Sequence, residues 1–254
     1  MNENFHIRVQ NITKEYRLYD KSSGRMISTL LPFFKKKYRR FKALDNISFN
    51  VKKGEIVGVI GRNGSGKSTL MRVIAGITTP TSGAVEVKGN IVPLFELGTG
   101  FHADLTGREN LRYFTLMQQF KKDKAAEIIQ HAIDFAEIGD FIDQPIRTYS
   151  RGMRSRLAFS ISLYIEADIL VIDEVLAVGD AAFKEKSYEK FNELITSGKT
   201  ILLVTHSEKE IEKVCTRAIL LHQGKIVMDG APAEVVEAYR VMSGKQGKKG
   251  NEKK

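Results

Sequence analysis

The stretch GRNGSGKST, from Gly61 to Thr69, lies between the apolar runs EIVGVI and LMRVIAGI. It matches G-x-x-x-x-G-K-[ST] without deviation, in the strand–loop–helix context that the motif requires. The glycines let backbone N–H groups turn inward on a β-phosphate, where the following helix N-terminus adds a favourable dipole. Lys67 would reach the β- and γ-phosphates, and Ser68 would ligate Mg²⁺. The loop predicts a nucleotide-binding site formed by Gly61, Arg62, Asn63, Gly64, Ser65, Gly66, Lys67, Ser68 and Thr69.

Two more apolar runs, ADILVIDE and KTILLVTH, are typical of fully buried parallel strands. Asp173 ends the first run, where a P-loop fold places the carboxylate that holds Mg²⁺ through water. Glu174 follows directly and would polarise the attacking water, the alternative being that it only caps a loop. His206 ends the second run at the ligand-binding edge of such a sheet, where it could contact the γ-phosphate. A lone histidine is more often structural.

The alternation of strand and helix patterns predicts a mainly parallel α/β core. Near the N-terminus, FHIRVQNITKEYRL and ALDNISFNVKKGE alternate as strands do, and SGAVEVKGNIV returns to a strand pattern. The remaining patterns predict a helix over 67–76, a mainly helical block over 106–166, a hairpin turning near Gln223-Gly224 and a closing helix in APAEVVEAYRVM.

Charge is unevenly distributed over this chain of net charge +10. Residues 17–42 carry +8 and residues 241–254 carry +4, so the rest of the chain is close to neutral. Such asymmetry indicates an acidic partner, either nucleic acid or an anionic membrane surface. The tail, SGKQGKKGNEKK, has no apolar residue to pack and is expected to be disordered.

The first basic segment also contains apolar residues. GRMISTLLPFFKKKYRRF places Phe33 and Phe34 beside a dense run of lysine and arginine. This composition fits a segment at a membrane interface, and the alternative is an insertion packed on its own domain. No apolar run of the sequence approaches the roughly 20 residues that span a bilayer.

Taken in order, GRNGSGKST, YSRGM at Tyr149–Met153, ILVIDE, AVGD ending at Asp180, and VTH resemble the ATP-binding cassette (ABC) ATPases. The resemblance runs from Ile7 to about Met242. It implies a P-loop NTPase with a RecA-like core, an N-terminal antiparallel β subdomain and an inserted helical subdomain at about 100–166. A single cassette over 1–242, with a basic insertion at 17–42, would precede a disordered tail at 243–254.

The resemblance also implies an assembly. In this family, two cassettes sandwich two ATP molecules head to tail, with Mg²⁺ as cofactor. The signature residues of one subunit touch the γ-phosphate bound by the other, and here these are Ser150, Arg151, Gly152 and Met153. Asp180 would belong to the D-loop between the subunits. One cassette per chain implies a homodimer or a partner cassette on another chain.

Two segments depart from the family pattern. The signature usually reads Leu-Ser-Gly-Gly-Gln; Ser150 and Gly152 are retained, whereas Arg151 and Met153 are not typical. The glutamine loop reads LFELGTGFHADLTGREN and lacks glutamine, so Glu96 or Leu97 takes its place. We favour Glu96 as the metal contact, because a carboxylate can approach Mg²⁺.

An aromatic side chain should stack on the adenine, and two candidates compete. Tyr16 has the family's sequence context, whereas Tyr38 has the usual spacing from Gly61. We favour Tyr16, and Phe41 is expected in the core.

The motifs ELGTGF, YS-x-GM and DE-x-L-AVGD, with the insertion after KEYRLY, look like the ATP-binding subunits that export cell-surface polymers. This resemblance implies translocation of a lipid-linked teichoic acid or an O-antigen or capsule-type polysaccharide. The sequence shows no C-terminal sugar-binding domain, which favours teichoic-acid or capsule-like export. The implied partners are an integral membrane permease and an anionic membrane surface, with no nucleic acid, and the implied location is peripheral, on the cytoplasmic side of the cell membrane.

Two other functions fit the sequence less well. A soluble ABC ATPase acting on nucleic acid or ribosomes would use the basic charge, but such proteins usually carry two cassettes or a long coiled coil. An importer cassette would have the glutamine that is absent here.

Overall fold

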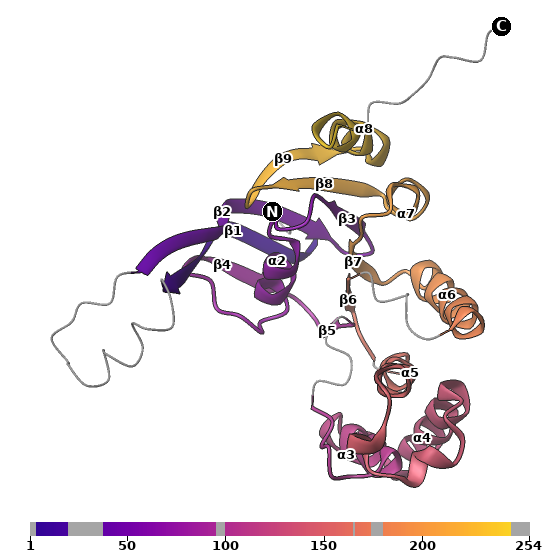
Figure 1. Cartoon of the computed structure of the whole chain (residues 1–254). Coiled ribbons are helices and arrows are strands. Elements are labelled where there is room, and N and C mark those ends of the chain that lie inside the picture. Colours follow the sequence, from indigo (N-terminus) through magenta and orange to yellow (C-terminus); the bar gives the residue numbers. More distant parts are fainter. Residues whose placement is uncertain (1–3, 20–37, 95–99, 165, 174–179, 245–254) are drawn as a thin grey trace, which may run out of the picture. The chain divides into compact units, whose positions relative to one another are not determined.

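Of the 254-residue chain, the computed structural model describes residues 4–19, 38–94, 100–164, 166–173 and 180–244 (Figure 1). The chain divides into two compact units, which are residues 1–53, 57–88 and 205–254 on one side and residues 54–56 and 89–204 on the other. Most of the predicted basic insertion and nearly all of the predicted tail lie outside the described residues.

The first unit contains an antiparallel sheet in the order β2-β1-β4, formed by β1 (Phe5–Tyr19), β2 (Tyr38–Lys52) and β4 (Ser82–Val87). Its buried face carries alternating aliphatic residues such as Ile7, Val9 and Ile12. Register shifts interrupt the β1–β2 pairing between Val9 and Glu15. Asn11 (φ 49°) and Asn46 (φ 56°) adopt the left-handed conformation at these bulges, which asparagine tolerates better than most residues.

A second group of strands in this unit supports the glycine loop. Strand β3 (Ile56–Ile60) is buried along its whole length and pairs in parallel with β8 (Arg217–His222), which pairs antiparallel with β9 (Lys225–Gly230). The loop after β3 leads into α2 (Lys67–Ile74), and α7 (Glu208–Val214) and α8 (Pro232–Met242) complete the unit. The β8–β9 turn at Gln223-Gly224 confirms the predicted hairpin.

The second unit contains three parallel strands in the order β5-β6-β7. They are β5 (Ile91–Pro93), β6 (Ile169–Asp173) and β7 (Thr200–Val204). Helix α6 (Ala181–Thr196) lies between β6 and β7 in the sequence. The single strand pattern predicted over SGAVEVKGNIV is therefore two strands, β4 and β5, which belong to different sheets.

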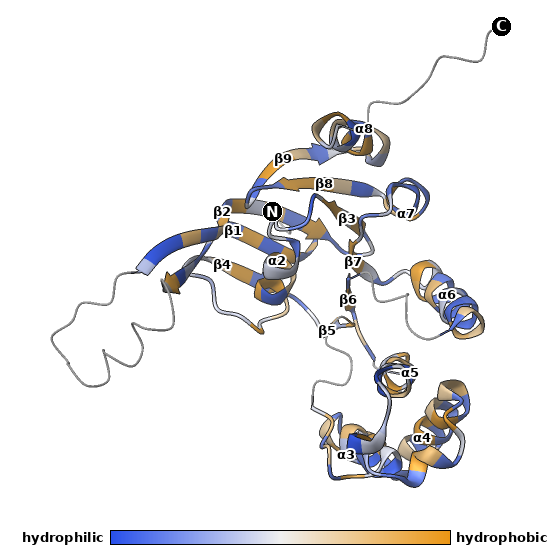
Figure 2. Ribbon diagram, viewed as in Figure 1, coloured by the Kyte–Doolittle hydropathy of each residue, from blue (hydrophilic) through white to orange (hydrophobic). Residues whose placement is uncertain are grey.

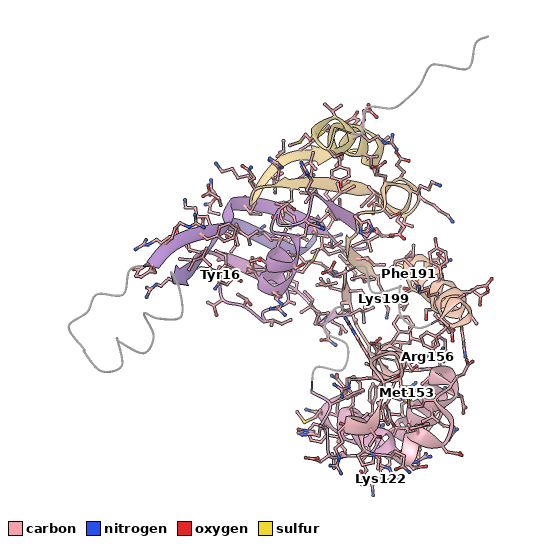
Figure 3. All side chains as sticks on the ribbon, viewed as in Figure 1. Tyr16, Lys122, Met153, Arg156, Phe191 and Lys199 are labelled. Atoms are coloured by element: carbon pink, nitrogen blue, oxygen red, sulfur yellow. The ribbon has the colours of Figure 1, made fainter. Side chains whose placement is uncertain are left out.

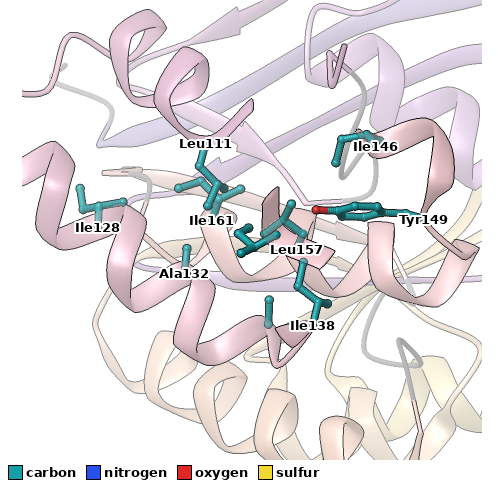
Figure 4. Packing of buried hydrophobic residues seen from close by; sticks show 10 residues of the cluster. Leu111, Ile128, Ala132, Ile138, Ile146, Tyr149, Leu157 and Ile161 are labelled. Atoms are coloured by element: carbon teal, nitrogen blue, oxygen red, sulfur yellow. The ribbon is translucent and has the colours of Figure 1, made fainter. Parts of the chain in front are cut away.

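Three helices of the second unit enclose a core of their own. They are α3 (Gly107–Met117), α4 (Lys122–Ala136) and α5 (Arg151–Ser162), with 3-10 turns η1 (Gly139–Asp143) and η2 (Ile146–Thr148) between α4 and α5. Leu111, Leu157 and Ile161 converge in this core (Figure 4). The turns account for the interruption predicted within the helical block.

A capping box starts α3. The Thr106 hydroxyl accepts a hydrogen bond from Glu109 N (3.1 Å), and the Glu109 carboxylate accepts one from Thr106 N (2.8 Å). The first residue of the helix, Gly107, has to be glycine because a Cβ there would lie 2.3 Å from Tyr149 Oη. The Tyr149 hydroxyl donates to Phe141 O (2.6 Å), which ties the start of α3, η1 and the start of α5 together.

The hydropathy of the strands and helices matches their burial. Strand β8 is apolar over most of its length, whereas α6 alternates between apolar and polar residues (Figure 2). Within the described part of the chain, no helix is both long and apolar enough to cross a bilayer.

Candidate nucleotide-binding site

The glycine loop packs tightly on its surroundings. A Cβ on buried Gly61 would lie 2.2 Å from Leu221 O, and one on Gly66 would lie 2.5 Å from Ala43 O. Gly66 (φ 109°) and Gly64 (φ 78°) also have backbone conformations that other residues rarely adopt. Ser65 O accepts from Gly224 N (2.8 Å), so the β8–β9 turn holds the loop from outside. Glycine is required at 61 and 66 by close contacts with backbone carbonyls.

The loop ends at the N-terminus of α2, and Gly66 precedes the helix without a side-chain cap. The first N–H groups of a helix lack intrahelical partners and carry its positive dipole end. Arg62, Asn63, Gly64 and Ser68 are exposed around this end, whereas Ser65 is buried. This arrangement of backbone donors suits an anion.

The Lys67 side chain folds back onto the glycine loop. Its Nζ donates to Gly61 O (2.7 Å) and approaches Arg62 O at 3.3 Å. The side chain is half-buried, so its ammonium group is held against the loop. Ser65 Oγ is buried and has no hydrogen-bond partner among the described residues. A ligand with oxygen acceptors would suit both groups.

The two aromatic candidates lie on opposite faces of the β1–β2 ribbon. Tyr16 pairs with Phe41 on one face, whereas Arg17 pairs with Arg40 on the other. Tyr38, two residues before Arg40 on β2, shares the face of Arg40. Tyr16 shares its face with Ile12 and Lys14, and Lys14 Nζ lies 5.3 Å from the Tyr16 ring centre and donates to Thr79 O. Tyr16 therefore belongs to the face that is buried farther along β1, and Tyr38 to the opposite one.

The prediction that Phe41 lies in the core is wrong, because 47% of its surface is exposed. It stands opposite Tyr16, which is 39% exposed, so two aromatic side chains share one face of the ribbon. Phe41 is two residues from Ala43, whose carbonyl contacts Gly66, which corresponds to about 7 Å along a strand. Only the bulged register reveals this neighbour of Tyr16, since alternation counted along the sequence misses it.

His206 belongs to the same unit as the loop and Tyr16. It is exposed and is the second residue after β7, between Thr205 and Ser207. Ser207 N donates to Thr205 Oγ1 (2.9 Å), and the Ser207 hydroxyl accepts from Glu210 N as the cap of α7. These bonds fix the backbone on both sides of the imidazole.

The other predicted site residues belong to the second unit. Asp173 is half-buried at the end of β6, opposite Val204 of β7. Ser150 caps α5, and its hydroxyl accepts from Met153 N (3.2 Å). Met153 packs against the helical core (Figure 3), while Arg151 and Gly152 are exposed. Glu96, Leu97 and Glu174 lie outside the described residues.

Asp180 caps α6 and joins it to α5. Its carboxylate accepts from Phe183 N (3.0 Å) and from the Arg156 guanidinium (2.5 Å). The Phe183 N–H and the Arg156 charge lower the pKa of Asp180 below its ordinary value. Arg156 also lies 4.7 Å from the Phe183 ring centre, so this one side chain of α5 contacts both the cap and the first turn of α6.

An α/β core in which a tight glycine loop joins a buried strand to an uncapped helix N-terminus defines a P-loop nucleotide-binding protein. Residues 44–177 match the family model described as ABC transporter, and the chain belongs to this family. Among solved structures it resembles a dimeric post-hydrolysis state of the ATP-binding cassette MJ0796 bound to ADP and Pi. The TM-score is 0.69 at 22% identity, over 89% of this chain and 98% of that chain.

Two curated relatives are export proteins. The chain is 45% identical over 237 residues to the teichoic acids export ATP-binding protein TagH of Bacillus anthracis, covering 93% of this chain and 42% of that protein. It is 40% identical over 239 residues to the O-antigen export system ATP-binding protein RfbB of Klebsiella pneumoniae, covering 92% of this chain and 97% of that protein. The chain thus spans less than half the length of the Bacillus TagH.

Proposed function

We propose that this protein is the ATP-hydrolysing subunit of an ABC exporter for a lipid-linked cell-surface polymer, a teichoic acid or an O-antigen or capsule-type polysaccharide. The glycine loop is the observation that carries the ATPase part, because its close contacts and positive φ angles suit a phosphate cradle. The names of the relatives support the polymer class. The protein would work on the cytoplasmic side of the cell membrane.

In this proposal, residues 61–69 bind the phosphates of ATP. Ser68 and Asp173 would hold Mg²⁺ together with the phosphates, with Glu96 as a further ligand, and the metal would neutralise phosphate charge. Glu174 would polarise the attacking water, and His206 would contact the γ-phosphate.

Tyr16 is the proposed adenine partner, with Phe41 beside it. Both side chains are on the ribbon face that continues into the buried face of β1, and both are partly exposed. A pair of aromatic rings offers a larger stacking surface than either ring alone. Tyr38, the other candidate, is on the opposite face of the ribbon.

Gly152 supports the proposed dimer. Glycine in a helix costs about 1 kcal/mol relative to alanine. A Cβ at 152 would lie 3.8 Å from Ser150 Oγ, the nearest atom found among the described residues, so contacts within that part of the chain do not require glycine there. Close approach of a nucleotide bound to a second cassette would require it. Ser150, Arg151, Gly152 and Met153 would then act in trans, and Asp180 would lie near the subunit interface.

Helix α3 offers a surface for the proposed permease. Tyr113, Leu116 and Met117 share one face at i, i+3 and i+4 spacing, and Leu116 and Met117 are 72% and 64% exposed. Contiguous exposed apolar side chains of this kind mark interaction sites. An apolar helix from a membrane subunit would bury them.

Two substitutions test the proposed chemistry in different ways. Lys67→Ala should abolish tight ATP binding or turnover, whereas Lys53→Ala, which removes an exposed lysine outside the loop, should have no effect. Glu174→Gln should retain ATP binding, lose hydrolysis and accumulate an ATP-bound dimer, seen as a doubled mass in light scattering. Near-normal ATPase activity of Lys67→Ala would refute the site. Native turnover by Glu174→Gln would place the general base elsewhere.

A further inference from the structure

The end of the β1–β2 ribbon places two arginines directly opposite each other. Arg17 of β1 and Arg40 of β2 are paired across the ribbon, so their side chains leave the same face. We name this the arginine face; its described side chains are Glu15, Arg17, Tyr38, Arg40 and Lys42. It is opposite the face of Tyr16 and Phe41. Like charges in such a pair repel each other, so the register holds two cations together at an energetic cost.

The neighbouring residues offset this positive charge only in part. Lys42 is paired with Asp45 at 3.0 Å, and Asp45 also approaches Lys225 at 3.3 Å. Arg40 approaches Glu15 at 3.6 Å, with 68% of the arginine side chain exposed. The Arg17 guanidinium lies 5.0 Å from the Tyr38 ring centre. Among the described side chains of this face, the half-buried Glu15 is the only carboxylate, and of the two arginines it approaches Arg40 alone, so an external anion would complete the cluster.

We propose that the arginine face binds the phosphate of an anionic phospholipid, with Arg17 and Arg40 as the two donors and Tyr38 at the interface. Guanidinium groups bind phosphate through paired N–H donors, which makes arginine better suited to this role than lysine. Tyr38, on the arginine face, is 37% exposed, and Leu18, which pairs with Arg39 on the opposite face of the same ribbon end, is 40% exposed. Tyrosine is enriched at membrane–water interfaces, and exposed apolar side chains beside cations favour lipid over nucleic acid.

This inference rests on the proposed membrane location but not on the ATPase chemistry, so the two can fail separately. The test is sedimentation of the full chain with phosphatidylcholine vesicles, with and without phosphatidylglycerol. Binding should require phosphatidylglycerol and weaken with added salt. Arg17→Gln/Arg40→Gln should weaken it about fivefold per arginine, the equivalent of about 1 kcal/mol each. Arg17→Lys/Arg40→Lys keeps the charge but lacks the paired N–H donors of the guanidinium groups. Its vesicle binding should therefore weaken less than that of the glutamine variant.

The matched control is Lys184→Gln/Lys209→Gln, which removes the same charge from exposed positions elsewhere. It should leave vesicle binding nearly unchanged, and all variants should hydrolyse ATP at the parent rate. The arginine variant should unfold at or above the parent temperature, because a like-charge pair is removed. Equal weakening by both double variants would overturn the proposal. So would an arginine variant that keeps vesicle binding and loses binding to a single-stranded oligonucleotide.

Discussion

Replacing Gly66 by alanine should damage the loop through two separable effects. The first is backbone strain, because φ is 109° at this position, and a side chain in a left-handed conformation costs about 1–2 kcal/mol. The second is a collision, because the new Cβ would lie 2.5 Å from Ala43 O, a backbone atom that can move only with β2. Forcing a methyl group into a packed site costs about 1–3 kcal/mol. The free energy of unfolding should therefore fall by about 2–5 kcal/mol.

Two other glycines separate the backbone strain from the collision. Gly76 (φ 72°) follows α2 outside the loop, and Gly64 (φ 78°) is in the loop, but a Cβ would meet no atom within 4 Å at either position. Gly76→Ala and Gly64→Ala should each lose only the strain, about 1–2 kcal/mol. Urea unfolding of the three variants measures these differences.

Titration with a fluorescent ATP analogue measures the effect on the cradle. Gly66→Ala moves the N-terminus of α2, so its affinity should fall at least about tenfold, the equivalent of about 1.4 kcal/mol. Gly76→Ala should bind the analogue as the parent does. If Gly66→Ala is no less stable than Gly76→Ala and binds the analogue normally, the proposed loop geometry is wrong.

Three further predictions concern the second unit. Tyr149→Phe removes the hydroxyl that donates to Phe141 O and should lower the free energy of unfolding by about 1 kcal/mol in urea. Leu111→Ala empties a fully buried position of the helical core and should lower it by about 2–5 kcal/mol, whereas Leu116→Ala, on the exposed face of the same helix, should change it little. Asp180 stabilises the fold through a lowered pKa, so its contribution is present above its ordinary value of 3.8 and is lost as the pH falls through the lower folded value. Asp180→Asn should therefore weaken the decline in stability below about pH 4, measured by thermal unfolding over a pH series; an unchanged pH profile would contradict this role.

Local signals predicted much of this molecule. The spacing of Gly61, Gly66 and Lys67 identifies the loop without any tertiary contact, and continuous apolar runs identify the buried strands. The register of β1 and β2 could not be predicted in the same way. Bulges at Asn11 and Asn46 shift the pairing by single residues, and each shift changes which cross-strand neighbours meet. A further shift between Lys14 and Glu15 places Phe41 opposite Tyr16, which alternation along the sequence does not predict.

Alternation along the sequence also fails to predict where the chain passes from one sheet to another. Lys88–Asn90 separates β4 from β5, and Asn90 N donates to Asp168 Oδ2 (2.8 Å), which ties this point to the residue directly before β6. Such a contact depends on a residue far away in the sequence, so alternation within residues 82–93 could not predict it.

The central claim is that this cassette energises a permease. Cysteine cross-linking can test it, because the chain has one native thiol that should contribute little reaction of its own. Cys215 is the only cysteine and is buried, and burial raises the pKa of its thiol to about 12, so it should react poorly at neutral pH. Leu116→Cys then places a reactive thiol on the exposed face of α3, and Lys209→Cys provides an exposed control on α7.

Cross-linking these variants in native membranes, followed by identification of the attached protein, is the most direct measurement. The proposed function predicts that Leu116→Cys captures an integral membrane protein with several spans, and that Lys209→Cys captures it far less. Capture of ribosomal or nucleic-acid-binding proteins at Leu116, with no membrane protein attached, would contradict the claim.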